Sequence, residues 1–125
     1  MSTREELEAL GRRAVACKGW RWIEGTIDTN GDVVAVALDN GYVAMASVAQ
    51  PDGERYPPDF SMAASRGCLL ELVRQAYGDP YIEAQPAVAE GLWLWRVSIR
   101  GDSRRDDFWY PSEAEALVAA LEAAP

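Results

Sequence analysis

The sequence predicts an α+β fold, with a single antiparallel sheet of about five strands packed by three helices in the order α-βββ-α-ββ(β)-α. Capping-box patterns begin helices near both ends of the chain, and an amphipathic stripe marks a third helix in the middle. Two Asn-Gly pairs separate short apolar runs, which is typical of β-hairpins. Turn signals are spread evenly over the 125 residues, so we expect one domain covering 1–125.

The first helix is predicted from Thr3 to about Gly19. The Thr3 hydroxyl can accept a hydrogen bond from the Glu6 amide, which is the N-terminal signature of a capping box. Apolar residues then recur at spacings of three and four, as expected for one buried helix face. This stripe consists of Leu7, Leu10, Ala14 and Cys17.

Three successive antiparallel strands are expected after this helix. Residues 20–27 are rich in aromatic and β-branched side chains, 33–38 form a continuous apolar run, and 42–48 have a similar character. The two Asn-Gly pairs join these runs by tight turns. The next segment, 50–58, contains three prolines and is predicted to be a surface loop.

The first of these turns begins like a calcium-binding loop. Asp28, Asn30 and Asp32 occupy positions 1, 3 and 5 of that motif. Position 6 requires glycine for a sharp turn, but here it is the β-branched Val33. We therefore interpret the segment as a hairpin turn of type I′, and we expect neither a metal ion nor another cofactor.

The central helix is predicted to follow the prolines, with Asp59 or Ser61 as its N-cap. Gly78 suits the left-handed position after its last turn. We expect this helix to cover the sheet with a stripe made of Leu69, Leu72, Val73 and Ala76.

The remaining strands flank a turn near Gly91. Residues 81–87 are predicted to form an edge strand because Pro86 lacks an amide hydrogen. Residues 92–100 alternate, which places Trp93, Trp95, Val97 and Ile99 on one face, and we expect the two tryptophans to fill the core. A short extended piece at 108–110 precedes the final helix, for which Ser112 begins a second capping box.

The charge and the missing histidine restrict the possible functions. The net charge of −8 disfavours binding to nucleic acid, which needs lysine and arginine to displace phosphate counterions. The chain contains no histidine, and this removes Ser-His-Asp and Cys-His nucleophiles and histidine-bound zinc. Its carboxylates form no recognisable pair for glycoside hydrolysis. We therefore expect a protein that is not an enzyme.

The hydropathy of the chain and its first residues indicate the cellular location. No apolar run approaches the roughly 20 residues that span a bilayer. The first residues, MSTREELEAL, form a charged helical start rather than a signal peptide. We expect a cytoplasmic protein of a bacterial host cell, without membrane contact.

Aromatic residues are the best candidates for a binding surface. Five tryptophans are present, and this side chain combines a large apolar area with one hydrogen-bond donor, which suits protein interfaces and ligand grooves. Packing in the core is the alternative for each of them. The candidate binding residues are Trp20, Trp22, Arg96, Phe108, Trp109 and Tyr110.

Several short motifs resemble those of small uncharacterised proteins of tailed phages and prophages. They are Gly19-Trp20-Arg21-Trp22, Pro58-Asp59-Phe60-Ser61 and the closing Ser112-Glu113-Ala114-Glu115-Ala116-Leu117-Val118-Ala119-Ala120-Leu121. Their order along the chain is similar to that of the phage αβα-sandwich proteins. The resemblance implies an α+β sandwich and a phage context, and it implies no activity and no site residues.

Together these observations predict a non-enzymatic phage or prophage accessory protein, or protein-binding domain, that acts through a protein partner. One alternative is an immunity-type inhibitor whose acidic face blocks a basic partner such as a nuclease. Another is a small-molecule binder with a tryptophan-lined pocket. A one-sided acidic surface would favour the inhibitor.

Overall fold

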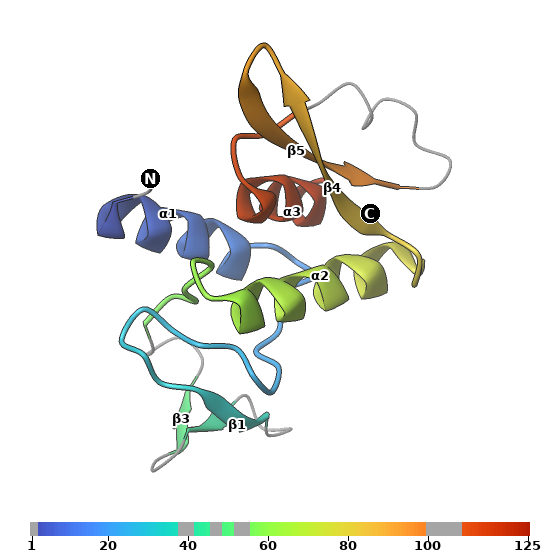
Figure 1. Ribbon diagram of the computed structural model, residues 1–125. Helices are drawn as coiled ribbons and strands as arrows, with labels where there is room; N and C mark the ends of the chain where they lie inside the picture. Colours follow the sequence, from blue (N-terminus) through green and yellow to red (C-terminus); the bar gives the residue numbers. More distant parts are fainter. Residues whose placement is uncertain (1–2, 38–41, 46–48, 52–55, 100–108) are drawn as a thin grey trace.

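The computed structural model describes residues 3–37, 42–45, 49–51, 56–99 and 109–125 and has the predicted α+β class (Figure 1). The three helices are α1 (Arg4–Val15), α2 (Ala63–Tyr77) and α3 (Glu113–Glu122). The strands are β1 (Val34–Ala37), β2 (Tyr42–Met45), β3 (Ala49–Pro51), β4 (Glu83–Ala89) and β5 (Leu92–Ser98). Among the described residues, none of the helices has the length and apolar character that a membrane span requires.

The prediction of a single five-stranded sheet is wrong. The described strands form two separate antiparallel sheets, one of order β1-β2-β3 and one made of β4 and β5. The helices lie between the two sheets, with β1 to β3 on one side and the β4–β5 hairpin on the other (Figure 1). Strands separated by a layer of helices cannot share backbone hydrogen bonds, so the sheets stay small.

Residues 20–27 do not form the predicted strand. They run irregularly through a turn at Gly25, whose φ is +95°, and reach only an isolated bridge between Ile27 and Val33. Trp22 is 3% exposed and packs with Val34 and Trp20 in a small hydrophobic cluster. The aromatic residues that favoured a strand prediction thus pack into a hydrophobic cluster from an irregular segment.

The predicted surface loop at 50–58 also differs. Its beginning belongs to β3, which pairs with β2. Its end is buried, because Pro57 and Pro58 lie against Gly11 of α1. Proline needs no amide partner, so these residues can be buried without leaving a donor unsatisfied.

The turn at 28–32 is confirmed, but its type is not I′. Among the described non-glycine residues only Glu90 has a positive φ, so Asn30 does not adopt the backbone that a type I′ turn needs. The Gly31 amide donates to the Asp28 carbonyl at 2.9 Å, and Gly31 takes a φ of +87°, as in a type I turn followed by a bulge. The second Asn-Gly pair, at 40–41, lies outside the described residues.

The turn between β4 and β5 has the backbone of a type I′ hairpin. Glu90 and Gly91 both have positive φ, at 53° and 78°. This two-residue turn matches the right-handed twist of the strands on either side. It sets the register in which Val88 faces Trp93 and Pro86 faces Trp95.

Three helix ends are confirmed, but α1 ends at Val15 rather than near the predicted Gly19, because the chain continues in turns in which the Cys17 amide donates to the Ala14 carbonyl at 3.0 Å. Thr3 and Ser112 each accept a backbone N–H at 3.1 Å, and Gly78 ends α2 with a φ of 64°. The predicted cap of α2 is wrong: Met62 occupies the N-cap without a side-chain hydrogen bond. Asp59 instead accepts from the Ser61 amide at 2.9 Å in the preceding turn.

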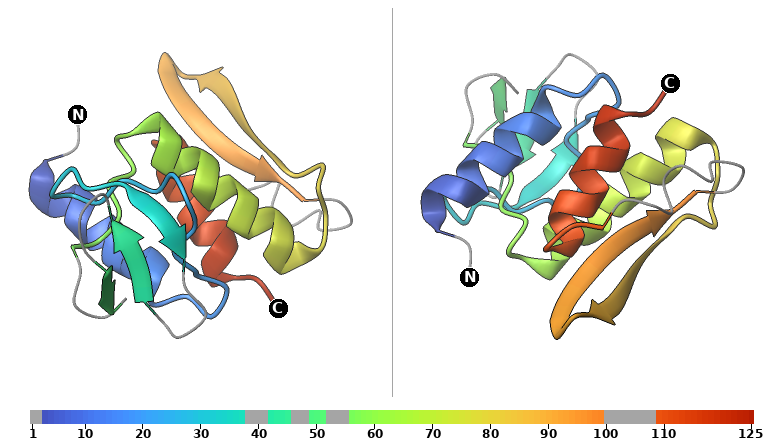
Figure 2. Two further views of the ribbon diagram at one scale, coloured as in Figure 1. Left: turned by 90° about the horizontal axis from the view of Figure 1, so that it is seen from below. Right: turned by 90° about the horizontal axis from the view of Figure 1, so that it is seen from above.

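Helix α3, rather than α2, lies at the centre of the domain. Seen from above, it runs between α1 and the β4–β5 hairpin (Figure 2), and it packs against α1, α2, β4 and β5. A helix with apolar residues around most of its circumference can be surrounded on several sides. Its buried residues are Ala114, Ala116, Leu117, Val118, Ala120 and Leu121.

Polar contacts attach the other two helices to α3. The Tyr77 hydroxyl of α2 donates to the Ala120 carbonyl at 2.8 Å. Arg13 of α1 lies 2.6 Å from the Glu122 carboxylate, and both side chains are partly exposed. A surface pair of this kind contributes at most about 1 kcal/mol, so burial rather than charge holds the helices together.

Replacement of Ser65 by alanine is expected to lower the free energy of unfolding by about 1–3 kcal/mol. Ser65 is fully buried in α2, where its hydroxyl accepts from the Ile27 amide and donates to the Ile27 carbonyl, both at 2.9 Å. Alanine would remove the acceptor of the Ile27 amide, whereas the Ile27 carbonyl keeps the Asp59 amide as a donor at 2.8 Å. Urea denaturation measures the change, and Ser61→Ala, at an exposed hydroxyl, should cost less than about 0.5 kcal/mol. Equal losses would contradict the structural role of Ser65.

Candidate functional site

One face of the β4–β5 hairpin changes from core to solvent along its length. Side chains two residues apart point to the same face, so Val97, Trp95 and Trp93 lie in one row. Val97 is 4% exposed and Trp95 is partly buried against the core, whereas Trp93 is 66% exposed. Val88, opposite Trp93 in the register, is 58% exposed. We call this the inner face of the hairpin.

The expectation that both tryptophans fill the core is therefore correct for Trp95 and wrong for Trp93. The hairpin projects beyond the helices (Figure 1), so nothing among the described elements covers its far end. Leu92, beside the turn, is also 61% exposed. Leu92 directly precedes Trp93 in β5, so its side chain lies on the opposite, outer face. We refer to Val88 and Trp93, which share the inner face, as the hairpin-tip patch.

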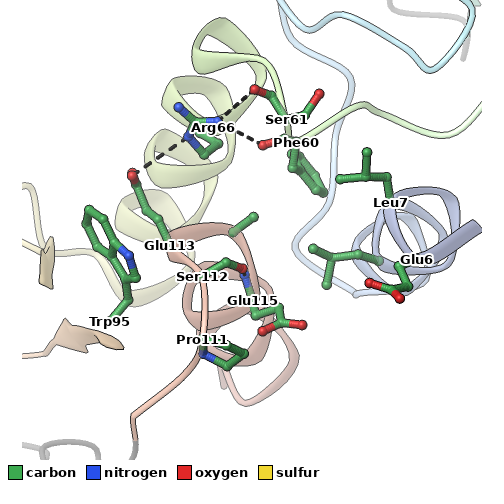
Figure 3. Close-up of a pocket in the computed structure, with 12 residues that line it drawn as sticks. Glu6, Leu7, Phe60, Ser61, Arg66, Trp95, Pro111, Ser112, Glu113 and Glu115 are labelled. Carbon is green, nitrogen blue, oxygen red and sulfur yellow. Dashed lines mark hydrogen bonds and ion pairs between the residues drawn. The ribbon is translucent and has the colours of Figure 1, made fainter. Parts of the chain in front are cut away.

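A pocket of about 380 Å³ lies where the inner face meets the three helices (Figure 3). Its apolar walls are Leu7 and Leu10 of α1, Phe60 before α2, and Trp95 of β5. The N-terminal end of α3 closes one side, where Ser112 caps the helix. Its lining therefore comes from segments that are far apart in the sequence.

Arg66 is the positively charged residue of this lining. Its Nη1 donates to the carbonyls of Phe60 and Ser61 at 3.0 and 2.9 Å, and its Nε lies 3.7 Å from Glu113 Oε2 (Figure 3). The guanidinium thus connects the turn before α2 with the start of α3. These contacts engage Nη1 and Nε of the guanidinium.

Three carboxylates outnumber this one cation. Glu6 belongs to the first turn of α1, and Glu113 and Glu115 belong to the first turn of α3. Carboxylates at these positions stabilise the helix dipole, which accounts for their charge without any ligand. The helix dipole does not account for Glu115 Oε2, which is buried and has no hydrogen-bond partner among the described residues.

Trp20 and Trp22 are not part of this surface. Their rings meet edge to face with centroids 5.4 Å apart, and Trp20 also meets Phe60 at 6.2 Å. Trp22 is buried and Trp20 is partly buried. Both tryptophans thus have a packing role beneath α1 and α2.

Three other predicted residues come together at β5. Tyr110 pairs with Trp95 through two backbone hydrogen bonds of 2.7 Å and packs against the core. The Arg96 guanidinium lies 5.0 Å from the centre of the Trp109 ring, a cation–π distance. Successive residues point to opposite faces, so Arg96 lies on the outer face, away from the pocket. Phe108 lies outside the described residues.

None of the residues that line the pocket was predicted as a site residue: Leu7, Leu10 and Trp95 were assigned to buried faces, and Ser61 and Ser112 to helix caps. Glu6, Glu113 and Glu115 have only the signal of a capping box, which indicates a helix start and not a site. Arg66 has no distinguishing pattern. No local motif could have shown that these residues meet.

Cys17 has the environment of a structural thiol. Its Sγ lies 3.3 Å from the Arg13 carbonyl. Burial raises the pKa of the Cys17 thiol, the Glu122 carboxylate raises it further, and Arg13 offsets part of this increase. A raised pKa keeps the group protonated at neutral pH, and a protonated thiol is a poor nucleophile.

Comparisons with protein-family models, with curated proteins and with solved structures gave no match.

Proposed function

We propose that this protein is a non-enzymatic protein-binding domain that binds its partner through the hairpin-tip patch and the adjacent pocket. The exposure of Trp93, at 66%, is the observation that carries the proposal. Tryptophan is enriched among the residues that dominate binding energy at interfaces. An accessory role in a phage or prophage is part of the proposal and depends on the sequence resemblance alone.

The arrangement of the patch favours an interface over chance exposure. Single exposed apolar residues are common on protein surfaces and need no explanation. Here Val88 and Trp93 are paired across the hairpin on one face, and both are more than half exposed. A projecting group of this kind, next to a pocket, is typical of a binding surface.

The hairpin also holds the patch in place. The type I′ turn at Glu90 and Gly91 fixes its end, and the backbone bonds between Trp95 and Tyr110 hold β5 on the side away from β4. A rigid aromatic side chain loses little conformational entropy on binding.

The two alternative functions have weaker support. Acidic residues occur on all three helices, in the 24–32 segment and in the hairpin, so the described part of the chain gives no indication of the one-sided acidic face expected of an inhibitor. The pocket has Trp95 as its one tryptophan, which gives less support to a tryptophan-lined ligand site.

A photo-crosslinking amino acid at position 93 tests the proposal in the native host. We expect it to capture a discrete partner that is not captured from position 81. Tyr81 is 75% exposed and precedes β4, at the end of the hairpin opposite the turn. With that partner purified, Trp93→Ala should weaken binding by about 2 kcal/mol or more, because an anchor residue is lost. Calorimetry measures the affinity.

Tyr81→Ala is the matched control and should leave the affinity nearly unchanged. Because Trp93 is largely exposed, its replacement should also leave the melting temperature close to that of the unmodified protein. Equal affinities for the two variants would disprove the role of the hairpin-tip patch.

A further inference from the structure

We propose that Pro86 keeps the free edge of the β4–β5 hairpin from pairing with a second copy of this chain. Pro86 is an exposed residue in the middle of β4, which pairs only with β5 among the described strands. An edge strand with free backbone groups is a template for another strand, and proline is one of the residues that prevent such pairing. The role of Pro86 is independent of the proposed function, because it concerns the backbone of β4 and not the hairpin-tip patch.

The turn determines which backbone groups of β4 face outwards. It contains two residues, so Ala89 and Leu92, which flank it, form a hydrogen-bonded pair. Hydrogen-bonded and non-hydrogen-bonded pairs alternate along an antiparallel ladder. Pro86 and Trp95 are three positions further from the turn and therefore form a non-hydrogen-bonded pair. The backbone nitrogen and carbonyl of Pro86 thus point away from β5.

The hydrogen bonds on the other side of β5 lead to the same assignment. The Trp95 amide donates to the Tyr110 carbonyl, and the Trp95 carbonyl accepts from the Tyr110 amide, both at 2.7 Å. The backbone groups of Trp95 therefore point away from β4, as they must in a non-hydrogen-bonded pair with Pro86. Tyr110 also covers part of the β5 edge, which leaves β4 as the longer open edge of the described hairpin.

Pro86 is the central residue of this open edge. Ala84, Pro86 and Val88 are the residues of β4 whose backbone groups face outwards, since they alternate with residues that bond to β5. Among the described residues, no backbone hydrogen bond reaches them from that side. Ala84 and Val88 each offer an amide and a carbonyl, but Pro86 offers only a carbonyl because its nitrogen bears no hydrogen. The row of donors is therefore interrupted at its middle.

This gap acts directly against a second copy of the chain. Identical surfaces pair about a two-fold axis, so that each residue of one copy faces its counterpart in the other. If two β4 strands overlapped fully in antiparallel orientation, Pro86 would face the same residue of the other copy. Both carbonyls at that position would lack a donor, and the two proline rings would meet. Shifted registers either lack a donor as well or overlap only a few residues.

The rest of β4 has little else that would prevent pairing. Glu83 is the only charged residue of the strand, and Val88 is 58% exposed. A short strand of low charge with an exposed β-branched residue is prone to pair along its edge. The protection of this edge therefore depends mainly on Pro86.

Sedimentation velocity of Pro86→Val and of the unmodified protein tests this role. The substitution restores one amide per copy, and thus two ladder hydrogen bonds in a symmetric pair. We expect the self-association constant to rise about tenfold or more. Ala87→Val is the matched control, because it adds the same side chain to β4 while its amide faces Leu94 of β5. This control should sediment like the unmodified protein.

Amide hydrogen exchange checks the geometry in the unmodified chain. After correction for intrinsic rates, the Val88 amide should exchange about tenfold faster or more than the Ala87 amide, which faces β5. In Pro86→Val, protection of the Val88 amide should increase with protein concentration. A Val88 amide that is as protected as that of Ala87 in the unmodified monomer would show that the edge is not free and would overturn the inference.

Pro86→Thr restores the same amide with a hydrophilic side chain, so the test remains decisive if Pro86→Val is insoluble. The Pro86 nitrogen makes no hydrogen bond, so both variants should keep at least the melting temperature of the unmodified protein. Unchanged sedimentation of Pro86→Thr, or equally strong association of Ala87→Val, would overturn the inference. Neither outcome depends on the capture of a partner from position 93, so the proposed function is tested separately.

Discussion

Leu117→Ala is expected to lower the free energy of unfolding by about 2–5 kcal/mol, the largest stability effect we predict for the described chain. Leu117 is fully buried in α3, the helix that packs against both other helices and against the β4–β5 hairpin. Its truncation removes apolar contact and leaves a cavity, which surrounding side chains fill only in part. A domain of this size has a total stability of about 5–15 kcal/mol, so much of it would be lost.

Chemical denaturation of the two proteins at one temperature measures this difference. The matched control is Leu92→Ala, which makes the same chemical change at a side chain that is 61% exposed. We expect that variant to remain within about 0.5 kcal/mol of the unmodified protein. A small loss for Leu117→Ala would mean that α3 is not the centre of the core.

Gly11→Ala is expected to destabilise the protein by about 1–3 kcal/mol, although alanine is the better helix former. Gly11 is a buried residue of α1, and an added Cβ would lie 2.5 Å from the Pro58 carbonyl oxygen and 3.0 Å from the Pro57 Cβ. The contact with the backbone oxygen is shorter than real side chains show and the contact with the Pro57 Cβ is tight, so α1 or the proline segment would have to move. The absence of a side chain at Gly11 therefore permits this close approach.

Gly67→Ala is the control for this prediction. Gly67 is an exposed glycine inside α2, and an added Cβ would meet nothing within 4 Å. The same substitution should there stabilise the protein by about 0.4–1 kcal/mol, because helix propensity acts without a clash. Thermal unfolding of both variants shows the sign of each change. A stabilising Gly11→Ala would contradict the packing of α1 on Pro57 and Pro58.

The two faces of the hairpin have different roles. The outer face has its own partners, since Arg96 stacks on Trp109 and donates to Gln85 at 3.4 Å. The inner face changes from the buried Val97 to the exposed Trp93. A strand with regular alternation thus stabilises the core at one end and presents the hairpin-tip patch at the other.

Elements with local signals could be predicted from the sequence. Thr3 and Ser112 accept the predicted capping bonds, and Gly78 ends α2 in the left-handed conformation. The alternation of β5 also correctly placed Val97 and Ile99 in the core. Each of these signals depends on hydrogen bonds or spacings within a few residues, so it can be recognised in the sequence alone.

Residues 20–27 and the division into two sheets could not be predicted in this way. Aromatic and β-branched residues suit a half-buried sheet surface, but they suit other buried positions equally well. Trp22 is buried against Val34 without joining a strand, and this depends on where the chain places Val34. Local sequence patterns also do not predict that the helices lie between the two sheets.

The sequence by itself determined the α+β class, the N-terminal caps of α1 and α3, the glycine end of α2 and the face alternation of β5, because capping bonds and periodicity are local. Only the tertiary structure decided that α3 is central, that Trp93 is exposed and that Glu6, Arg66, Trp95 and Glu115 line one pocket. The physical reason is that burial depends on which elements meet. These contacts between elements depend on the packing of the whole chain, and residue spacing along the sequence does not predict them.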